Sequence, residues 1–132
     1  MDSLKKSIGL KHIFVIFVLL YTTPLFAQNE GLYTVSDNRE YGFIDKTGKM
    51  VIQPQYDYAA GFSEGLAHIK IQGKRGFINK TGKTVIEAKY TRVMDFSDGV
   101  AAVKIEGLWG YIDKTGKMII KPQFDYAYNF NG

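Results

Sequence analysis

Apolar and polar residues alternate in short segments along most of this chain, which is the pattern of β-strands. In Leu66–Ile71 the alternation places Ala67, Ile69 and Ile71 on one face of the predicted strand. The corresponding positions of Val100–Ile105 are apolar too, so we expect this face to pack against the core. Outside the N-terminal segment, no stretch shows the 3.6-residue apolar period of an amphipathic helix.

A phrase of eight residues recurs at a spacing of 34 residues, beginning at Gly42, Gly76 and Gly110. A period of this length indicates a repeat architecture, in which each unit buries its apolar face on its neighbours. Each unit is predicted to form a three-stranded antiparallel meander with a connecting loop. The fold class is therefore all-β, an open array because three units are too few to close a propeller. We place the repeat domain at 28–132, with units of approximately 31–64, 65–98 and 99–132.

Turn residues recur at fixed places in each unit. The second strand ends in a turn where Asp or Asn bonds the backbone and Gly accepts a left-handed conformation, at Asp45, Gly48, Asn79, Gly82, Asp113 and Gly116. Asn79 cannot act as an acid or a base, so the turn interpretation is favoured over paired catalytic carboxylates. We expect the third strand to end near Pro54 and Pro122. The tail of the unit is predicted to be a loop with an aromatic plug, a short strand or a helical turn.

Residues 1–27 have the layout of a secretory signal peptide. Lys5, Lys6 and Lys11 precede the apolar run Ile13–Leu20 as a basic region, and Ala27 offers a small residue for cleavage. The run is shorter than the roughly 18–20 apolar residues that span a membrane. We therefore expect a cleaved leader helix and a secreted or periplasmic chain with no stable membrane span, while an uncleaved anchor is the alternative. The chain has no Cys that could carry a lipid.

Charge excludes one class of partner. The predicted leader holds three of the 17 basic residues and one of the 13 acidic residues, which leaves 14 against 12. Basic and acidic residues alternate along the turns, as on an ordinary solvated surface. Nucleic-acid binding would require a basic stripe with interleaved aromatic residues, so we predict no nucleic-acid partner.

The repeated phrase resembles the WG-repeat family of bacterial proteins over about residues 31–132. It reads aromatic-Gly-[Tyr/Phe]-Ile-Asp-Lys-Thr-Gly-Lys, followed by an apolar pair, Pro, an aromatic residue and Phe-Ser-[Glu/Asp]-Gly-[Leu/Val]-Ala. The Trp-Gly pair itself occurs once, as Trp109-Gly110, while Tyr41 and Arg75 stand at the place of Trp in the other copies. The resemblance implies a β-rich repeat, often exported, with no enzymatic activity and no catalytic residues.

No catalytic, cofactor-binding or metal-binding residues are predicted. His68 is the single histidine after the leader, and a lone His is a poor metal ligand set, so we expect it on the surface. The lysines of the repeated turn, Lys46, Lys80 and Lys114, are expected to be solvated.

Most aromatic residues are expected to form the core between units. Some are candidates to line a ligand groove, where half-exposed rings would stack on a sugar or hold a peptide: Tyr58, Tyr126, Trp109 and Tyr41.

The function expected is that of a non-enzymatic exported binding or scaffold protein of the cell envelope, with a protein or a surface glycan as partner. The alternative is a purely structural module that self-associates as a homo-oligomer through the open edges of its repeat array. The last unit shows no polar cap, which leaves two interpretations: a fragment of a longer array, or an open edge that pairs with another chain.

Overall fold

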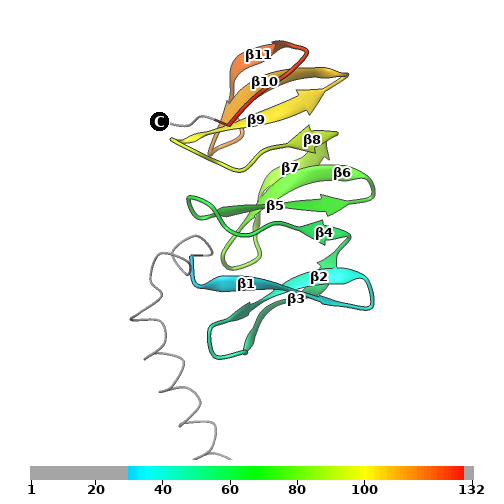
Figure 1. Ribbon diagram of the computed structural model, residues 1–132, viewed down its shortest axis with the longest axis vertical. Helices are drawn as coiled ribbons and strands as arrows, with labels where there is room; N and C mark the ends of the chain where they lie inside the picture. Colours follow the sequence, from blue (N-terminus) through cyan, green and yellow to red (C-terminus); the bar gives the residue numbers. More distant parts are fainter. Residues whose placement is uncertain (1–29, 130–132) are drawn as a thin grey trace, which may run out of the picture.

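The computed structural model describes residues 30–129, so the predicted signal peptide lies outside the described residues. Within them there are only β-strands, bridges and turns, and no helix that could cross a membrane. The strands, shown in Figure 1, are β1 (Leu32–Asp37), β2 (Glu40–Asp45), β3 (Met50–Tyr56), β4 (Tyr58–Ala59), β5 (Leu66–Ile71), β6 (Lys74–Asn79), β7 (Thr84–Tyr90), β8 (Arg92–Val93), β9 (Val100–Ile105), β10 (Leu108–Asp113) and β11 (Met118–Phe124).

The strands form three antiparallel sheets, and two of them borrow a strand from the preceding repeat. The sheet orders are β1-β2-β3, β4-β5-β6-β7 and β8-β9-β10-β11. The two-residue strand β4 belongs to the tail of the first repeat and pairs with β5, with Tyr58 opposite Lys70. In the same way β8 pairs with β9, with Arg92 opposite Lys104. The tail is thus a short strand, and the prediction of an open all-β repeat array is confirmed.

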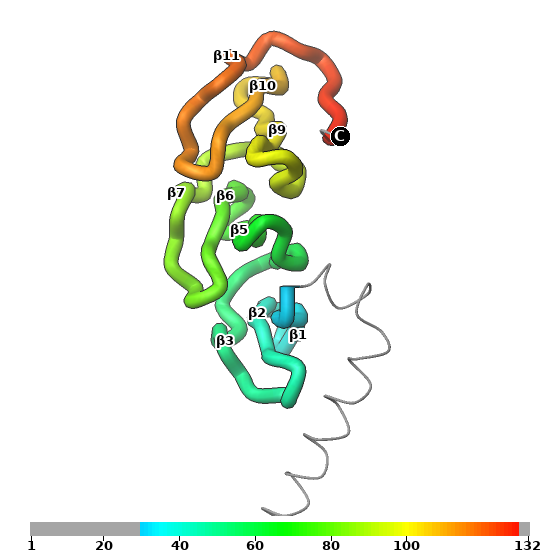
Figure 2. The backbone as a smooth tube through the Cα atoms, turned by 90° about the vertical axis from the view of Figure 1, so that its left-hand side faces the viewer, coloured from blue at the N-terminus to red at the C-terminus, as the bar shows by residue number. Residues whose placement is uncertain are grey.

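The core lies between neighbouring sheets, which are stacked one above the other (Figure 2). After β4 and β8 the tail buries a phenylalanine: the ring centroid of Phe62 lies 4.9 Å from that of Phe43, and Phe96 lies 4.8 Å from Phe77. The two interfaces bury equivalent residues, the first Leu32, Phe43, Ile52, Tyr56, Phe62, Ala67, Ile69 and Ile78, and the second Leu66, Phe77, Ile86, Tyr90, Phe96, Ala101, Val103 and Ile112.

The predicted packing face of β5 is buried only in part. Ala67 and Ile69 are fully buried as expected, but Ile71 is 40% exposed. Leu66, which we placed on the opposite face, is buried in the second interface. Both faces of the strand are covered because the sheet is sandwiched between two neighbours, so a simple alternation of buried and exposed residues does not apply.

The glycine of the repeated phrase lets two backbones approach closely. The register between β2 and β3 shifts at Gly42, and a Cβ atom there would lie 2.4 Å from the carbonyl oxygen of Ile52. The shift is a β-bulge, which bends β3 over the glycine. Our prediction that the third strand ends near Pro54 was wrong, because β3 continues to Tyr56. Proline is tolerated there because β3 is an edge strand.

The predicted turn chemistry is present in all three copies. In the first, Oδ1 of Asp45 accepts hydrogen bonds from the Thr47 N–H at 2.8 Å and the Lys49 N–H at 3.1 Å. Gly48 takes a φ of +85° and donates its N–H to the carbonyl oxygen of Asp45 at 3.0 Å. Asn79 and Asp113 accept equivalent bonds. Accepting these hydrogen bonds, first of all that from the Thr47 hydroxyl, lowers the pKa of Asp45, so the carboxylates are structural.

A polar contact also joins each sheet to the next, from the turn that precedes β1 or β5 to the sheet that follows. A carboxylate oxygen of Glu30 accepts the Gly65 N–H at 2.8 Å and lies 3.3 Å from Nζ of Lys80. Glu64 repeats this contact, with the Gly99 N–H at 2.9 Å and Nζ of Lys114 at 3.4 Å. We call this arrangement the inter-repeat clamp. Lys80 and Lys114 are exposed, as expected, with 44% of each side chain accessible, and each one also contacts a carboxylate in the turn before β1 or β5 of the neighbouring sheet.

Candidate functional site

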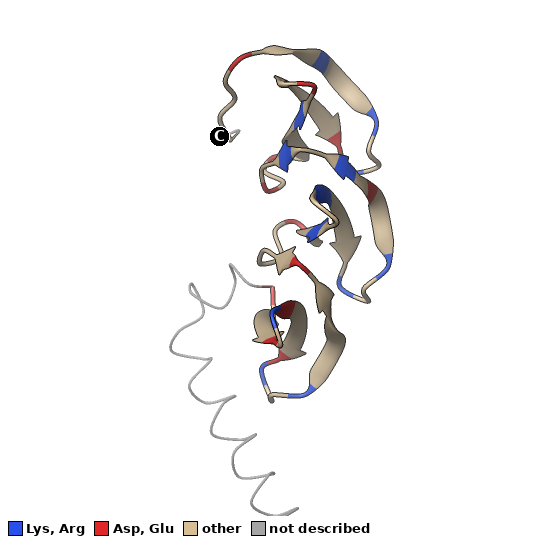
Figure 3. Ribbon diagram, turned by 90° about the vertical axis from the view of Figure 1, so that its right-hand side faces the viewer, with Lys and Arg blue, Asp and Glu red and all other residues tan. Residues whose placement is uncertain are grey.

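A groove of about 680 Å³ lies at the boundary of the second and third sheets. We call it the boundary groove; it is lined by Tyr58, His68, Lys70, Gly73, Arg75, Thr91, Arg92, Val93, Met94 and Trp109. These residues come from β4, β5, the β5–β6 hairpin, β6, β8 with its flanking residues, and β10. Figure 3 shows the stack from the side on which the β1–β2 and β5–β6 hairpins lie in Figure 1, with Lys and Arg in blue.

Tyr58 and His68 are held together at one end of this groove. Their rings stack with centroids 5.6 Å apart and an interplanar angle of 28°. The guanidinium carbon of Arg75 lies 5.1 Å from the centre of the Tyr58 ring, at cation–π distance. Tyr41 contacts Tyr58 from the first sheet, at a centroid distance of 5.6 Å. Tyr41 is thus not a lining residue of the groove but a neighbour of one.

His68 is largely covered by its neighbours, which corrects our prediction that it lies on the surface. Its side chain is only 11% exposed, and Nδ1 lies 3.4 Å from Nη1 of Arg75. Because a guanidinium only donates, Nδ1 is the acceptor and the ring proton is on Nε2, which lies 3.4 Å from Oδ1 of Asp95. Burial, and then the charge of Arg75, lower the pKa of His68 to about 4. At neutral pH the ring is therefore uncharged.

Two of the three cations of the groove replace aromatic residues of the other repeats. Arg75 stands where the other repeats have Tyr41 and Trp109, and Arg92 where they have Tyr58 and Tyr126. Across the first boundary these two positions hold the contacting rings of Tyr41 and Tyr58. Across the second they hold two guanidinium groups. Together with Lys70 they make three cationic residues in the groove, and none of the described lining residues is a carboxylate.

Trp109 lies in the wall of the groove with its ring largely covered. It is 7% exposed, and Nζ of Lys104 lies 5.8 Å from the ring centre. The structure thus brings Trp109 and Tyr58 together on one groove, as two of the four candidate aromatic residues. Trp109 is largely covered, whereas Tyr58 is 39% exposed and contacts Tyr41, His68 and Arg75.

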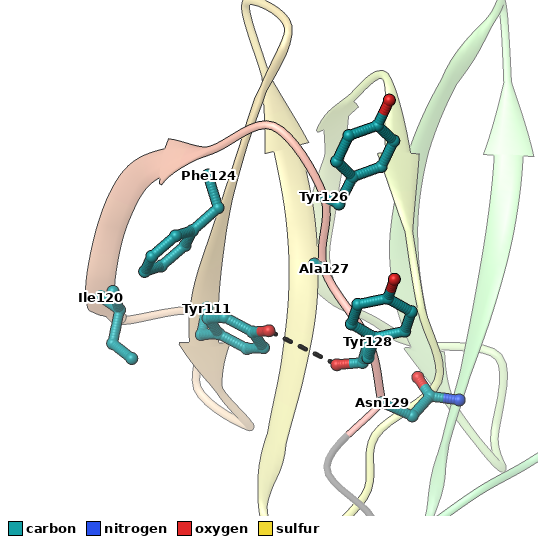
Figure 4. Close-up of a pocket in the computed structure, with 7 residues that line it drawn as sticks. All are labelled: Tyr111, Ile120, Phe124, Tyr126, Ala127, Tyr128 and Asn129. Carbon is teal, nitrogen blue, oxygen red and sulfur yellow. Dashed lines mark hydrogen bonds between the residues drawn. The ribbon is translucent and has the colours of Figure 1, made fainter.

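Tyr126 lies elsewhere, at a second hollow of about 400 Å³ at the C-terminal end of the stack (Figure 4). It is 81% exposed. We call this hollow the terminal face; it is lined by Tyr111, Ile120, Phe124, Tyr126, Ala127, Tyr128 and Asn129. The hydroxyl of Tyr111 donates to the carbonyl oxygen of Tyr128 at 3.4 Å. The four candidate aromatic residues therefore do not form a single shared groove.

The boundary groove offers binding groups but no activated nucleophile. Its Thr91 donates its hydroxyl to the carbonyl oxygen of Lys104 at 3.1 Å. The nitrogen of His68 that would accept a proton faces a cation instead. Among residues 30–129, no group of three or more His, Cys, Asp or Glu side chains could hold a metal ion. The arrangement is suited to recognising an anion.

Sequence reasoning missed the cations of this groove. Arg75 and Arg92 were visible only as departures from an aromatic pattern, 17 residues apart. The useful signal was that both departures fall in the second unit and that they replace a pair of positions that meet across a boundary. His68 carried no signal of its own, because Asp95 and Arg75 reach it only in the folded stack.

Comparison with known proteins supports the repeat assignment. The family described as WG containing repeat matches residues 41–74, 76–109 and 109–132. Searches of curated proteins and of solved structures gave no significant match. The matched segments cover well over half of the chain and contain the glycine of each bulge, the turn carboxylate or amide, and the buried aromatic residues described above. The chain therefore belongs to the WG-containing-repeat family.

Proposed function

We propose that this protein is a non-enzymatic, exported binding module of the bacterial cell envelope that holds an acidic segment of a partner protein in its boundary groove. The observation that carries the proposal is the joint presence of Arg75, Arg92 and Lys70 on one groove without a lining carboxylate. Export is supported by the leader-like residues 1–27.

An anion is the ligand that this groove fits. Guanidinium groups present several donors in a planar fork that matches a carboxylate, and charge-assisted hydrogen bonds are stronger than neutral ones. Neutral His68 adds no further charge at neutral pH, but its contacts hold Arg75 and Tyr58 in place. A ligand carboxylate between the two arginines would relieve the repulsion of the like charges.

A protein segment is favoured over a glycan by the state of the aromatic rings. Sugar recognition by aromatic residues requires an open ring face, and Tyr58 is already in contact with Tyr41, His68 and Arg75. Trp109 is buried beneath Lys104. The polar and charged groups therefore dominate what a ligand would meet, as an acidic peptide requires.

The test uses Trp109, the single tryptophan of the chain, as a reporter in the wall of the groove. Its fluorescence would be followed while the purified protein is titrated with an oligoglutamate peptide, with polygalacturonate and with neutral dextran. We expect saturable binding of the peptide that weakens with added salt because the ions screen the attraction. Tighter binding of polygalacturonate would replace the protein partner by an acidic glycan. Absence of a response to both anions would refute the proposal.

Two variants separate groove binding from general charge attraction. Arg92→Gln should weaken peptide binding roughly tenfold or more, since a hydrogen bond to a charged group contributes about 1.5–3 kcal/mol. Lys83→Gln is the matched control, because it removes one exposed cation that does not line the groove. Equal losses in the two variants would show that the groove is not the binding site.

A further inference from the structure

Within residues 30–129, the first sheet has three strands, whereas the second and third sheets each have four. In the second and third sheets, the preceding repeat supplies a two-residue strand that pairs with the outer edge of β5 or β9. Among the described residues, no such strand pairs with the outer edge of β1. The segment of the third repeat that corresponds to β4 and β8 is Tyr126-Ala127, and within residues 30–129 it joins no sheet. Among the described residues, one end of the stack thus has an unpaired sheet edge, and the other has an unpaired segment at the place of β4 and β8.

The inter-repeat clamp is likewise incomplete at both ends. Asp98 stands at the place of Glu30 and Glu64, and it is exposed, with no cation in contact among the described residues. Lys46 stands at the place of Lys80 and Lys114, and it too is exposed and meets no carboxylate in the described part of the chain. Gly31 stands at the position of Gly65 and Gly99, whose N–H groups donate to the carboxylate of the clamp.

The apolar surfaces at the two ends are complementary in the same way. Phe124, on the terminal face, is 41% exposed, whereas the equivalent Tyr56 and Tyr90 are 4% and 1% exposed because a further sheet covers them. The turn glycine of each following repeat lies on the isoleucine of β3 or β7: a Cβ atom at Gly82 would lie 3.3 Å from Cγ1 of Ile52. At Gly48 a Cβ atom would meet nothing within 4 Å, and Ile120 lines the terminal face (Figure 4).

We propose that two copies of this protein associate head to tail, with the terminal face of one copy seated on the β1 edge of the next. The unpaired segment Tyr126-Ala127 would pair as a short strand with Ser36 and Val35 of the second copy, in the register that β4 keeps with β5. Asp98 of one copy would meet Lys46 of the other. The contact repeats the interface that the chain already makes twice inside itself, so it requires no new kind of packing.

Such a contact uses different surfaces on the two copies, so each added copy exposes a fresh terminal face. Backbone pairing of a strand with an open sheet edge supplies affinity, and the side chains of the face supply specificity. The inference does not depend on the boundary groove, which lies within one chain. An array of copies would present the groove repeatedly along one side.

Light scattering with sedimentation of the purified protein, from micromolar to near-millimolar concentrations, tests the association. We expect a mass that rises with concentration beyond that of a dimer. Phe124→Ser should weaken the association roughly tenfold or more. Ile119→Ser is the matched control, since Ile119 is 52% exposed on the neighbouring part of β11 and does not line the terminal face. A monomer at every concentration, or equal effects of the two variants, would overturn the proposal.

A charge exchange tests the orientation of the two copies. Asp98→Lys and Lys46→Glu should each weaken self-association several-fold, because each one places like charges at the clamp. Mixing the two variants should restore association, since both kinds of contact in the mixture then join opposite charges. Failure of the mixture to exceed the separate variants would rule out the head-to-tail arrangement.

The absence of cysteine in the chain permits a clean cross-linking test of the register. A variant that carries both Ser36→Cys and Tyr126→Cys should form disulfide-linked ladders on oxidation. Ser36→Cys with Ile119→Cys should not. Cross-links of equal yield in the two variants would contradict the proposed strand pairing.

Discussion

Replacing Phe96 by Ala is expected to detach the third sheet from the second while the first two sheets remain packed. Phe96 is 1% exposed in the second interface, and its ring lies 4.8 Å from that of Phe77. Removing a buried phenylalanine side chain costs about 3–5 kcal/mol. In a stack of repeats this loss falls on one interface, because each sheet contacts only its neighbours. A sheet of such a stack that loses its neighbour leaves its apolar face exposed, so it has little stability of its own.

Phe62→Ala is the matched variant, since Phe62 holds the equivalent place in the first interface and is also 1% exposed. It should detach the first sheet and leave the second and third together. Trp109 reports on the third sheet alone, because it is the single tryptophan and lies in β10. Its unfolding midpoint in urea should fall in Phe96→Ala by roughly 2 M, from a loss of about 4 kcal/mol and a denaturant slope of about 2 kcal/mol/M. In Phe62→Ala the midpoint should change little.

Far-ultraviolet circular dichroism follows all three sheets in the same experiment. In Phe96→Ala the fluorescence transition should precede the main loss of circular dichroism, and in Phe62→Ala it should follow the first phase. Coincident transitions by both probes in both variants would mean that the sheets unfold as one cooperative unit. That result would refute the reasoning that each interface acts separately.

The pKa of His68 is about 4 in the folded chain and about 6.5 in the unfolded chain, so between these values the unfolded state binds a proton that the folded state does not. The free energy of unfolding should therefore fall by roughly 2 kcal/mol between about pH 7 and about pH 5. Urea titrations of His68→Ala should lack this part of the loss. Arg39 takes a φ of +70° at the place where the second repeat has Gly73, so Arg39→Gly should raise the melting temperature, with a gain of about 1 kcal/mol, and Gly73→Ala should lower it. Glu64→Ala should destabilise by about 1 kcal/mol through loss of the clamp, whereas Asp98→Ala, measured at dilution, should be neutral; equal effects in chemical denaturation would argue against the clamp.

The fold could be predicted from the sequence because its determinants are local and repeated. Asp45 and Gly48 specify a turn within five residues, and three copies of the same turn fix the period. The donated strand was harder to foresee, since two residues such as Tyr58-Ala59 are too short to show alternation. Pro54 was misleading because its tolerance depends on β3 being an edge strand, which is a property of the sheet order.

The candidate site depends on contacts between repeats, which the sequence does not state. Arg75 and Arg92 lie on different strands and come to one groove only through the stacking of the second and third sheets. His68 is largely covered because Tyr58 of the preceding tail stacks on its ring. The aromatic candidates were found by composition and period. Their division between the boundary groove and the terminal face arises because the short strand at the end of each repeat pairs with the next sheet.

The donation of a short strand from one repeat to the next sheet has a consequence for how proteins of this kind change in length. Because each complete sheet includes a strand from the preceding sequence repeat, the boundary of a sheet does not coincide with the start of the repeated sequence motif. Gene duplication in steps of 34 codons would add one whole layer wherever the break falls, since every cut reproduces the same junction on both sides. Gain or loss of layers would thus leave the surrounding contacts unchanged, while a novelty such as the paired arginines can arise in a single layer without disturbing the rest.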